Sequence, residues 1–395
     1  MRIPDTPPVI QSLLDNDFYK FTMQHAVVKL FPRAKAHYRF INRGNHRFPD
    51  HFSVVLRQEL DRMAELRLTG EEKQYLALTC PYLDPTYLDF LQGFRYDPSE
   101  VTVRQTGGEL DVSISGYWYR TILWEVPVMA LISELYYRVS GLQRNSDEQV
   151  AAVTRSKIEH YRQLGVKIAE FGTRRRHSYA VHRLVVETLK QYGEGSFTGT
   201  SNVHLAFRSG VKPIGTHAHE WFMFHAAGYG FKMSNRMALE HWVEVYRGDL
   251  GIALSDTYTT PVFFAAFDKK FSKLFDGIRH DSGDPLVFAQ AAIDHYRAFN
   301  IDPLSKTIIF SDGLDPQKVD RIAAFCRGKV GMSFGIGTNF TNDAGLPALN
   351  IVIKMVSAQP EDRHWIPVVK LSDEPGKYTG DPEMIALAKT VLQIS

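Results

Sequence analysis

Val166–Ser178 reads VKIAEFGTRRRHS, and this stretch decides the fold: a short apolar run stops at a glycine and is followed by arginines and a histidine. Similar apolar runs recur down the chain, each ending in a polar loop that leads into a helical pattern. This is typical of strand–loop–helix units around a parallel sheet. We predict strands at residues 166–171, 196–199, 211–215, 250–254, 275–278, 306–310, 330–334 and 349–356. Such a series favours an irregular (β/α) barrel over an open sheet.

The part of the chain before this series has a different rhythm. The patterns predict a helix over 15–30, a strand over 36–43, helices over 53–67 and 71–92, a hairpin over 102–115 and a buried helix over 124–139. We therefore predict an α/β protein with two domains. Residues 1–140 together with 358–395 form the first domain, and residues 141–357 form the barrel.

Composition excludes several classes of protein. The 395 residues hold 46 Lys plus Arg and 44 Asp plus Glu, so the formal net charge is only +2, which argues against a dedicated nucleic-acid binder. The most apolar segment, 124–139, contains charged residues and is too short to span a bilayer. The N-terminus lacks the apolar stretch of a signal peptide, and Cys80 and Cys326 fit no metal-site spacing. We expect a cytoplasmic protein without a membrane partner.

Nearly every loop that follows a predicted barrel strand carries Arg, His, Asp or Ser. Active sites of barrels are built from these loops, at the carboxyl ends of the strands. Arg174 and Arg175 follow the first strand directly, and the planar guanidinium matches a carboxylate or a phosphate. A single loop of this kind would be an ordinary solvated turn, but a series of them indicates a polar, anionic ligand.

The loop RHDSGDP, residues 279–285, places two carboxylates three residues apart at a strand end. Carboxylates in this position can receive ribose hydroxyls or a hydrated Mg²⁺ ion. Asp284 also fits the N-cap of a helix that begins at Pro285, so it can be explained by structure alone. Asp281 has no such structural explanation and is the better candidate for a functional carboxylate.

Two further loops are candidates for phosphate binding. They are SDGLDP, residues 311–316, and FGIGTNF, residues 334–340. Gly335 and Gly337 allow close backbone approach, and Thr338 adds a hydroxyl, so successive amides could cradle an anion. The pattern is weak alone, because tight turns use paired glycines constantly. The chain contains neither a P-loop motif nor a Rossmann fingerprint.

The loop THAHEW, residues 216–221, offers His217 and His219 two residues apart. A His-x-His pair at the end of a barrel strand is a zinc-ligand pattern, so a metal-dependent hydrolase is one alternative. The later loops supply Asp and Arg rather than the further histidines that such a site needs. A His that acts as a nucleophile or in proton transfer is the other reading.

The first predicted helix opens with LLDNDFYKFTM, residues 13–23. Asp17 fits an N-cap, and Lys20 fits a side chain that runs over apolar surface with its ammonium group in water. Tyr19 suits stacking on a flat ligand.

Taken together, the motifs resemble those of the bacterial type of nicotinate phosphoribosyltransferase. LLDNDFYKFTM, RFINR, EFGTRRRHS, GTSN, GTHAHEW, SDTY, GIRHDSGDP, IIFSDGLD, FGIGTN and LNIVIKMV occur in that family's order, from about residue 10 to residue 380. The resemblance implies transfer of phosphoribosyl from phosphoribosyl pyrophosphate to nicotinate, giving nicotinate mononucleotide and pyrophosphate. It also implies coupled ATP hydrolysis, a requirement for Mg²⁺, and a type II phosphoribosyltransferase fold. That fold combines an irregular α/β barrel, which agrees with the predicted barrel, with an α/β sandwich made from both chain ends.

The resemblance further implies roles for individual residues. Tyr19 and Phe171 would sandwich the pyridine ring, while Arg174, Arg175 and Ser201 would hold the carboxylate. Arg279 and Asp281 would be catalytic: Arg279 would meet nicotinate or phosphate oxygens, and Asp281 would take the ribose hydroxyls or the hydrated metal. The phosphoribosyl group and its phosphate would be bound by Ser282, Gly283, Asp312, Gly335, Gly337 and Thr338. Mg²⁺ would be held through substrate phosphates rather than by direct ligands. His219 matches the histidine that ATP phosphorylates in the family.

Three alternatives remain open at this level. A related subgroup that uses nicotinamide carries Asp where Ser201 stands, so Ser201 favours the acid. The barrel metal hydrolase built on His217 and His219 is the second, and a nucleotide-sensing barrel without turnover is the third. The resemblance also suggests a homodimer with a shared active site, in which Tyr19 comes from the neighbouring subunit.

Overall fold

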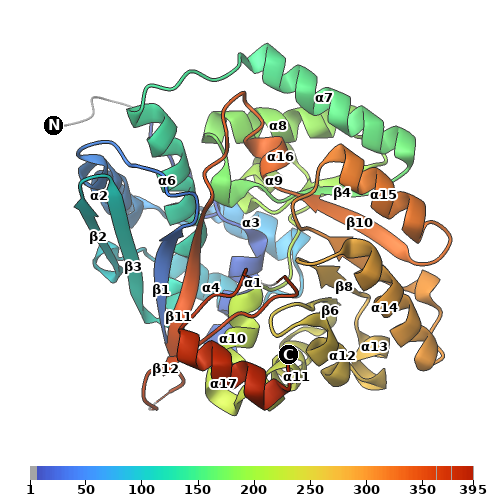
Figure 1. Ribbon diagram of the computed structural model, residues 1–395. Coiled ribbons are helices and arrows are strands. Elements are labelled where there is room, and N and C mark those ends of the chain that lie inside the picture. The colour runs from blue at the N-terminus through green and yellow to red at the C-terminus, as the bar shows by residue number, and fades with distance from the viewer. Residues whose placement is uncertain (1–6, 362, 375, 395) are drawn as a thin grey trace.

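The computed structural model describes residues 7–361, 363–374 and 376–394 and contains two sheets (Figure 1). One is a parallel sheet with the strand order β5-β4-β10-β9-β8-β7, and the other is antiparallel with the order β12-β11-β1-β3-β2. The predicted α/β class is therefore confirmed. Among the described residues, no helix is long and apolar enough to cross a membrane.

The parallel sheet uses six of the predicted strands. They are β4 (Ile168–Glu170), β5 (Phe197–Thr200), β7 (Ile252–Leu254), β8 (Gly277–His280), β9 (Thr307–Phe310) and β10 (Gly331–Ile336). The helices α7 (Asp147–Leu164), α8 (Tyr179–Tyr192), α9 (Val203–Ser209), α14 (Pro285–Ala298) and α15 (Pro316–Cys326) alternate with them. In α15 the buried residues are Val319, Ile322, Ala323 and Cys326, a spacing that places one apolar stripe against the sheet.

Residues 211–215, predicted as a barrel strand, form only an isolated bridge between Pro213 and Thr200. The reason is that proline has no N–H to donate to a ladder, so it is confined to sheet edges. Two backbone hydrogen bonds still hold this segment beside β5: Thr200 N donates to Lys212 O (3.2 Å), and Ile214 N donates to Thr200 O (2.9 Å).

The residues that follow this segment complete the barrel by contacting β7 through their side chains. Thr216 Oγ1 donates to Ile252 O (3.0 Å), and Leu254 N donates to His217 Nε2 (3.1 Å). The barrel is irregular, as predicted, because a seam of side-chain contacts stands where a strand ladder would complete it.

The antiparallel sheet contains β1 (Lys35–Asn42), β2 (Val101–Thr106), β3 (Glu109–Tyr117), β11 (Ile351–Gln359) and β12 (Ile366–Pro367). The prediction that residues 349–356 close the barrel is wrong, because β11 pairs antiparallel with β1. Ile351, Ile353 and Met355 are buried while the residues between them are half-buried. That alternation is typical of an antiparallel strand with two different faces.

The helices of the N-terminal part are α1 (Phe18–Leu30), α2 (Phe52–Arg62), α3 (Gly70–Thr79), α4 (Pro85–Gly93), α5 (Trp118–Thr121) and α6 (Glu125–Val139). The single helix predicted over 71–92 is wrong: it is two helices. The break lies before Pro85, which occupies the first turn of α4, where a missing N–H costs nothing. The predicted hairpin over 102–115 is confirmed as β2 and β3, which turn at Gly107 with φ of +55°.

Further elements lie in the barrel part of the chain and near its C-terminal end. They are the 3₁₀ turn η3 (Thr173–Arg175), α10 (His219–Tyr229), α11 (Phe231–Tyr246), β6 (Arg247–Leu250), α12 (Thr260–Ala266), α13 (Lys269–Leu274), α16 (Thr338–Thr341) and α17 (Pro382–Leu392). Both α6 and α10 contact β11, which brings the antiparallel sheet to the barrel.

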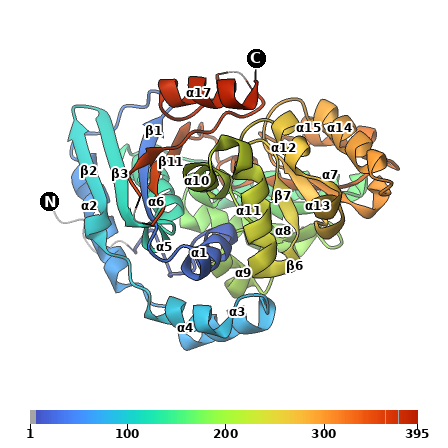
Figure 2. The ribbon, with the colours of Figure 1, turned by 90° about the horizontal axis from the view of Figure 1, so that it is seen from below.

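The segment after β12 contacts both parts of the molecule: Arg43 Nη2, just after β1, donates to Thr379 Oγ1 (3.2 Å), and other contacts reach the barrel part. In Figure 2, α17 lies across the top of the view, and it contacts α11. Leu371 N donates to Thr257 O (2.9 Å), beyond the end of β7, whereas β12 itself pairs with β11. The assignment of residues 358–395 to the first domain, like the boundaries 1–140 and 141–357, stays a prediction.

Candidate functional site

Three adjoining cavities lie where the parallel strands end, and all three are lined by Arg174 and Arg279. The inner cavity, about 190 Å³, lies within the barrel and is lined by residues of β4, β5, β7, β9 and β10. The sheet-side cavity, about 300 Å³, lies between the barrel mouth and β11. The loop-side cavity, about 380 Å³, is bounded by the loops after β9 and β10.

The inner cavity gathers the residues predicted to bind nicotinate. Tyr19, Phe171, Arg174 and Ser201 line it, while Arg175 lines the other two cavities. Tyr19 arrives from α1 of the same chain. The structure thus brings two aromatic rings and an arginine to one small, largely apolar cavity, while their role in binding nicotinate stays a prediction.

Ser201 has a partner that the sequence did not suggest. Its Oγ donates to Asp17 Oδ1 (2.6 Å), and Asp17 lines the same cavity. Asp17 lies at the N-cap position of α1, but its carboxylate does not cap the helix. Burial raises the pKa of this carboxyl above its ordinary value, although Arg174 opposes the shift. Asp17 is thus a lining residue rather than the predicted cap.

His219 opens α10 and is held by hydrogen bonds to both ring nitrogens. Nε2 is 3.0 Å from Asp281 Oδ2, and Nδ1 is 3.1 Å from Thr257 Oγ1. Burial, with help from Lys370, lowers the pKa of His219 to about 4, so the ring is neutral at pH 7. An ionised carboxylate only accepts, so Nε2 carries the proton and Nδ1 carries the lone pair.

Asp281 and Arg279 form the centre of the site. Arg279 Nη2 donates to Asp281 Oδ1 (2.7 Å), and Arg279 Nε donates to Ser311 Oγ (2.8 Å). Burial alone would raise the pKa of Asp281, but Arg279 and His219 hold it well below its ordinary value. Asp281 is therefore an anion that joins the arginine to the histidine.

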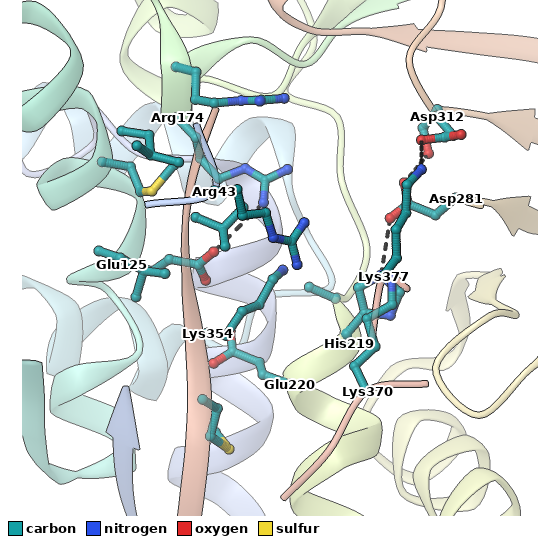
Figure 3. A pocket seen from close by; sticks show the side chains of 18 of the residues that line it. Arg43, Glu125, Arg174, His219, Glu220, Asp281, Asp312, Lys354, Lys370 and Lys377 are labelled. Carbon is teal, nitrogen blue, oxygen red and sulfur yellow. Dashed lines mark hydrogen bonds and ion pairs between the residues drawn. The ribbon is translucent and has the colours of Figure 1, made fainter. Parts of the chain in front are cut away.

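The sheet-side cavity contains four cations that sequence reasoning missed: Arg43, Lys354, Lys370 and Lys377 (Figure 3). Lys354 lies on β11, and burial lowers its pKa to about 8. A lone lysine inside the apolar run LNIVIKMV was the signal that could have revealed it. Lys377 lies 3.7 Å from Asp312, and Lys370 lies 3.2 Å from Asp256.

The predicted phosphate-binding residues divide into two groups. Gly335, Gly337 and Thr338 line the loop-side cavity, and Asp312 lines the sheet-side cavity. Gly335 has a packing reason as well, because a Cβ there would stand 2.3 Å from the Phe171 ring.

Ser282 and Gly283 are not among the described residues that line the three cavities. Ser282 Oγ instead donates to Asp256 Oδ2 (2.6 Å) and accepts from Asp373 N (3.1 Å). The geometry thus places them behind the site rather than in contact with a ligand. The predicted N-cap is confirmed, since Asp284 accepts from Leu286 N and Val287 N.

The geometry does not favour the alternative of a His217–His219 metal centre. His217 is buried, and its Nε2 accepts the Leu254 N–H in the barrel seam. The described residues that could gather around an ion are His219, Asp256 and Asp281, whose ligand atoms lie within 4.8 Å of one another. Asp256 Oδ1 is buried and has no hydrogen-bond partner, which fits an oxygen ligand awaiting a hydrated Mg²⁺ ion.

The fold and cavities thus define an enzyme that handles anionic, phosphate-bearing ligands. Two family models match the chain: the nicotinate phosphoribosyltransferase N-terminal domain over residues 14–133 and the nicotinate phosphoribosyltransferase family over residues 166–395. A nicotinate phosphoribosyltransferase of Chromohalobacter salexigens is 65% identical over 387 residues, which covers 98% of this chain and 99% of that protein. One of Desulforapulum autotrophicum is 48% identical over 386 residues, with the same coverage of each chain.

A solved structure agrees. The crystal structure of nicotinate phosphoribosyltransferase from Porphyromonas gingivalis superposes with a TM-score of 0.96 at 49% identity, covering 98% of this chain and 100% of that one. The chain belongs to the nicotinate phosphoribosyltransferase family. It is an enzyme of pyridine nucleotide biosynthesis that converts nicotinate to nicotinate mononucleotide.

Proposed function

We propose that this enzyme couples ATP hydrolysis to phosphoribosyl transfer through phosphorylation of His219. The observation that carries the proposal is a neutral histidine, fixed by Asp281 and Thr257, that lines a lysine-rich cavity next to the pyridine pocket. A neutral imidazole is a nucleophile at pH 7, and clustered cations suit the phosphates that would approach it.

On the pyridine side, Tyr19 and Phe171 hold the ring of nicotinate in the inner cavity, and Arg174 binds its carboxylate. Arg175, which lines the two adjoining cavities, adds positive charge beside Arg174. The ring nitrogen is already nucleophilic, so the transfer needs no proton removal. Loss of pyrophosphate leaves positive character at the anomeric carbon, and catalysis comes from positioning and from stabilising the departing charge. Arg279 lines all three cavities and is the residue best placed to contact that charge.

The backbone around Gly335, Gly337 and Thr338 binds the 5-phosphate in the loop-side cavity. Asp281, as the sequence predicted, and Asp256, which the sequence analysis did not single out, suit a hydrated Mg²⁺ ion that enters with the substrate phosphates. When bound, the ion would neutralise part of the pyrophosphate charge. Lys354, Lys370 and Lys377 supply the remaining positive charge on the sheet side.

At His219, the Thr257 hydroxyl releases Nδ1, whose lone pair then attacks the γ-phosphorus. The bond to the β–γ bridging oxygen breaks, and ADP leaves. Nε2 keeps its proton, and its hydrogen bond to ionised Asp281 stabilises the cationic ring. The phosphohistidine adds about 1.5–2 negative charges to the site. Hydrolysis to phosphate then returns the enzyme to its starting state, so ATP changes substrate affinity rather than the chemistry of transfer.

The test is His219→Asn, which keeps the size and one hydrogen-bonding edge but removes the nucleophile. The variant should form nicotinate mononucleotide slowly from phosphoribosyl pyrophosphate and nicotinate while losing ADP formation and stimulation by ATP. Wild type incubated with Mg·ATP should gain one acid-labile phosphoryl mass on the peptide containing GTHAHEW. His160→Asn is the matched control, because His160 is half-exposed on α7 and pairs with Asp320 (2.7 Å). ATP stimulation that survives in His219→Asn would refute the proposal.

The cytoplasmic location and a homodimer with a shared site belong to the same proposal. In this structure the chain's own Tyr19 lines the inner cavity. A second subunit is therefore not needed to supply this ring.

A further inference from the structure

Lys20 lies in α1, one residue after Tyr19, and its side chain is fully buried. The sequence suggested a lysine whose ammonium group reaches water, and that prediction is wrong. A buried ammonium group is costly unless it is closely paired. Two carboxylates pair with it: Glu125 Oε2 at 2.5 Å, and Glu220 Oε1. Burial alone would lower the pKa of Lys20, but these carboxylates raise it, so the charge stays.

Glu125 divides its two oxygens between two cations. Oε2 contacts Lys20, while Oε1 lies 3.7 Å from Arg174 Nη1, as the dashed line in Figure 3 shows. Glu125 opens α6 and lines the sheet-side cavity. If the Glu125 carboxylate moves closer to Lys20, its ion pair with Arg174 becomes longer and weaker.

Glu220 also divides its oxygens. Oε1 pairs with Lys20, and Oε2 accepts from Tyr38 Oη on β1 (2.6 Å). Glu220 directly follows His219 in the first turn of α10. These contacts therefore fix the start of the helix that carries His219, and any displacement of that turn moves a partner of Lys20.

We propose that Lys20 is a positioning residue that couples the state of His219 to the affinity of Arg174 for the pyridine substrate. This inference rests on the proposed function, in which His219 accepts the phosphoryl group and Arg174 binds the nicotinate carboxylate. A phosphoryl group on His219 brings negative charge to the first turn of α10 and displaces Glu220. Lys20 then shifts between its two carboxylates, and Glu125 changes its hold on Arg174. Lys20 itself touches no substrate in this scheme.

The experiment measures KM for nicotinate with and without ATP in wild type and in Lys20→Met. In wild type, ATP should lower this KM by a factor of about 5–150, the usual range for coupled sites. In Lys20→Met the factor should fall below about three, while ADP is still formed. A purely structural role would change KM equally in both conditions and leave the ratio intact. Lys306→Met is the control: that lysine is also largely buried, but it donates to the Phe275 carbonyl (2.7 Å), outside the cavities, so it should keep the wild-type ratio.

A second variant guards against failure of Lys20→Met to fold. Glu220→Gln keeps the shape and the oxygen that accepts from Tyr38, but it removes the charge opposite Lys20, so its ratio should also fall below about three. An unchanged ratio in either folded variant overturns the coupling role of Lys20 and leaves the proposed function standing. If wild type shows no ATP effect on KM, the role of ATP fails first, and the coupling fails with it.

Discussion

Arg174 and Arg176 stand two residues apart, yet they belong to different regions of the molecule. Arg176 is fully buried, and its Nη1 and Nη2 donate to the two oxygens of Asp15 at 2.7 and 2.9 Å. The Arg174 side chain is 38% exposed, and its paired carboxylate, Glu125, is 3.7 Å away. The difference teaches that an arginine with two hydrogen bonds to one buried carboxylate stabilises the fold. An arginine whose N–H groups are only loosely paired can instead bind a ligand.

The largest expected effect lies in the scaffold. Arg176→Ala would leave Asp15 as an unpaired buried carboxylate and should lower the free energy of unfolding by about 3–5 kcal/mol. Urea unfolding followed by circular dichroism measures this. Arg176 holds the pKa of Asp15 below its ordinary value despite burial, so this stabilisation is present above about pH 4 and is lost as the pH falls through the lowered pKa. If the free energy of unfolding fell by less than about 1 kcal/mol, Arg176 would not be a major contributor to stability, and its contrast with Arg174 would fail.

Arg279 tests the other side of the comparison. Arg279→Ala should lower kcat/KM by roughly 2–4 kcal/mol in transition-state free energy, because one charge-assisted contact to the leaving group disappears. Initial rates of pyrophosphate release give the value. An unchanged kcat/KM would show that Arg279 has a structural role and does not contact the leaving group, although it lines all three cavities.

Arg174 should separate binding from stability. Arg174→Ala should raise KM for nicotinate. The rise should correspond to a loss of about 1.5–3 kcal/mol of binding free energy, which is typical of a hydrogen bond to a charged group. Its free energy of unfolding should change by less than about 1 kcal/mol, because a half-exposed and loosely paired arginine stabilises little. The comparison with Arg176 breaks if the two variants lose equal stability.

Ser201 sharpens the comparison at the level of specificity. Ser201→Asp would place a second carboxylate beside Asp17 and repel the acid substrate while leaving an amide acceptable. The preference for nicotinate over nicotinamide should fall about tenfold, or about 1.4 kcal/mol. Competition between the two substrates measures the ratio, and an unmoved ratio would show that Ser201 serves only Asp17.

The smallest expected effect concerns Lys354, whose pKa is about 8 in place of 10.5 because of burial. It is charged below pH 8 and neutral above it, so the affinity for pyrophosphate should fall a few-fold as the pH rises through this value. Lys354→Met should bind more weakly at pH 7 and lose this step. Calorimetry between pH 7 and 9 tests both points. A step that persists in the variant would assign the titration to another group.

Much of the fold followed from local pattern. Six strands ended in polar loops, and the parallel sheet formed from them, because each apolar run could be buried only against its neighbours. The wrong strand predictions concern segments whose place in a sheet depends on which strand they pair with. Residues 349–356 are as apolar as a barrel strand, and only their pairing with β1 assigns them to the other sheet. Pro213 could have warned that 211–215 makes no full ladder.

The site divides in the same way. Arg174, Arg279 and Asp281 were predictable because their loops follow strands. Lys354 and Lys370 could not be predicted in this way. They lie on β11 and after β12, and only the folding of the chain brings these segments to the barrel mouth. Asp17 and Lys20 looked like a cap and a surface lysine. Their roles depend on Ser201, Glu125 and Glu220, which lie more than a hundred residues away along the chain.

The seam of the barrel has a kinetic consequence. Segment 214–218 is joined to β7 by the Thr216 hydroxyl and the His217 ring rather than by a row of amide–carbonyl bonds. Two side-chain contacts hold this segment on β7, and Ile214 N and Thr216 O also bond to Thr200 and Thr22, whereas β8 is held by backbone ladders to both β7 and β9. Amide protons beside the seam should therefore exchange with deuterium long before those of β8. The chain that leads into His219 would be among the first parts of the barrel to open and the last to become protected during folding.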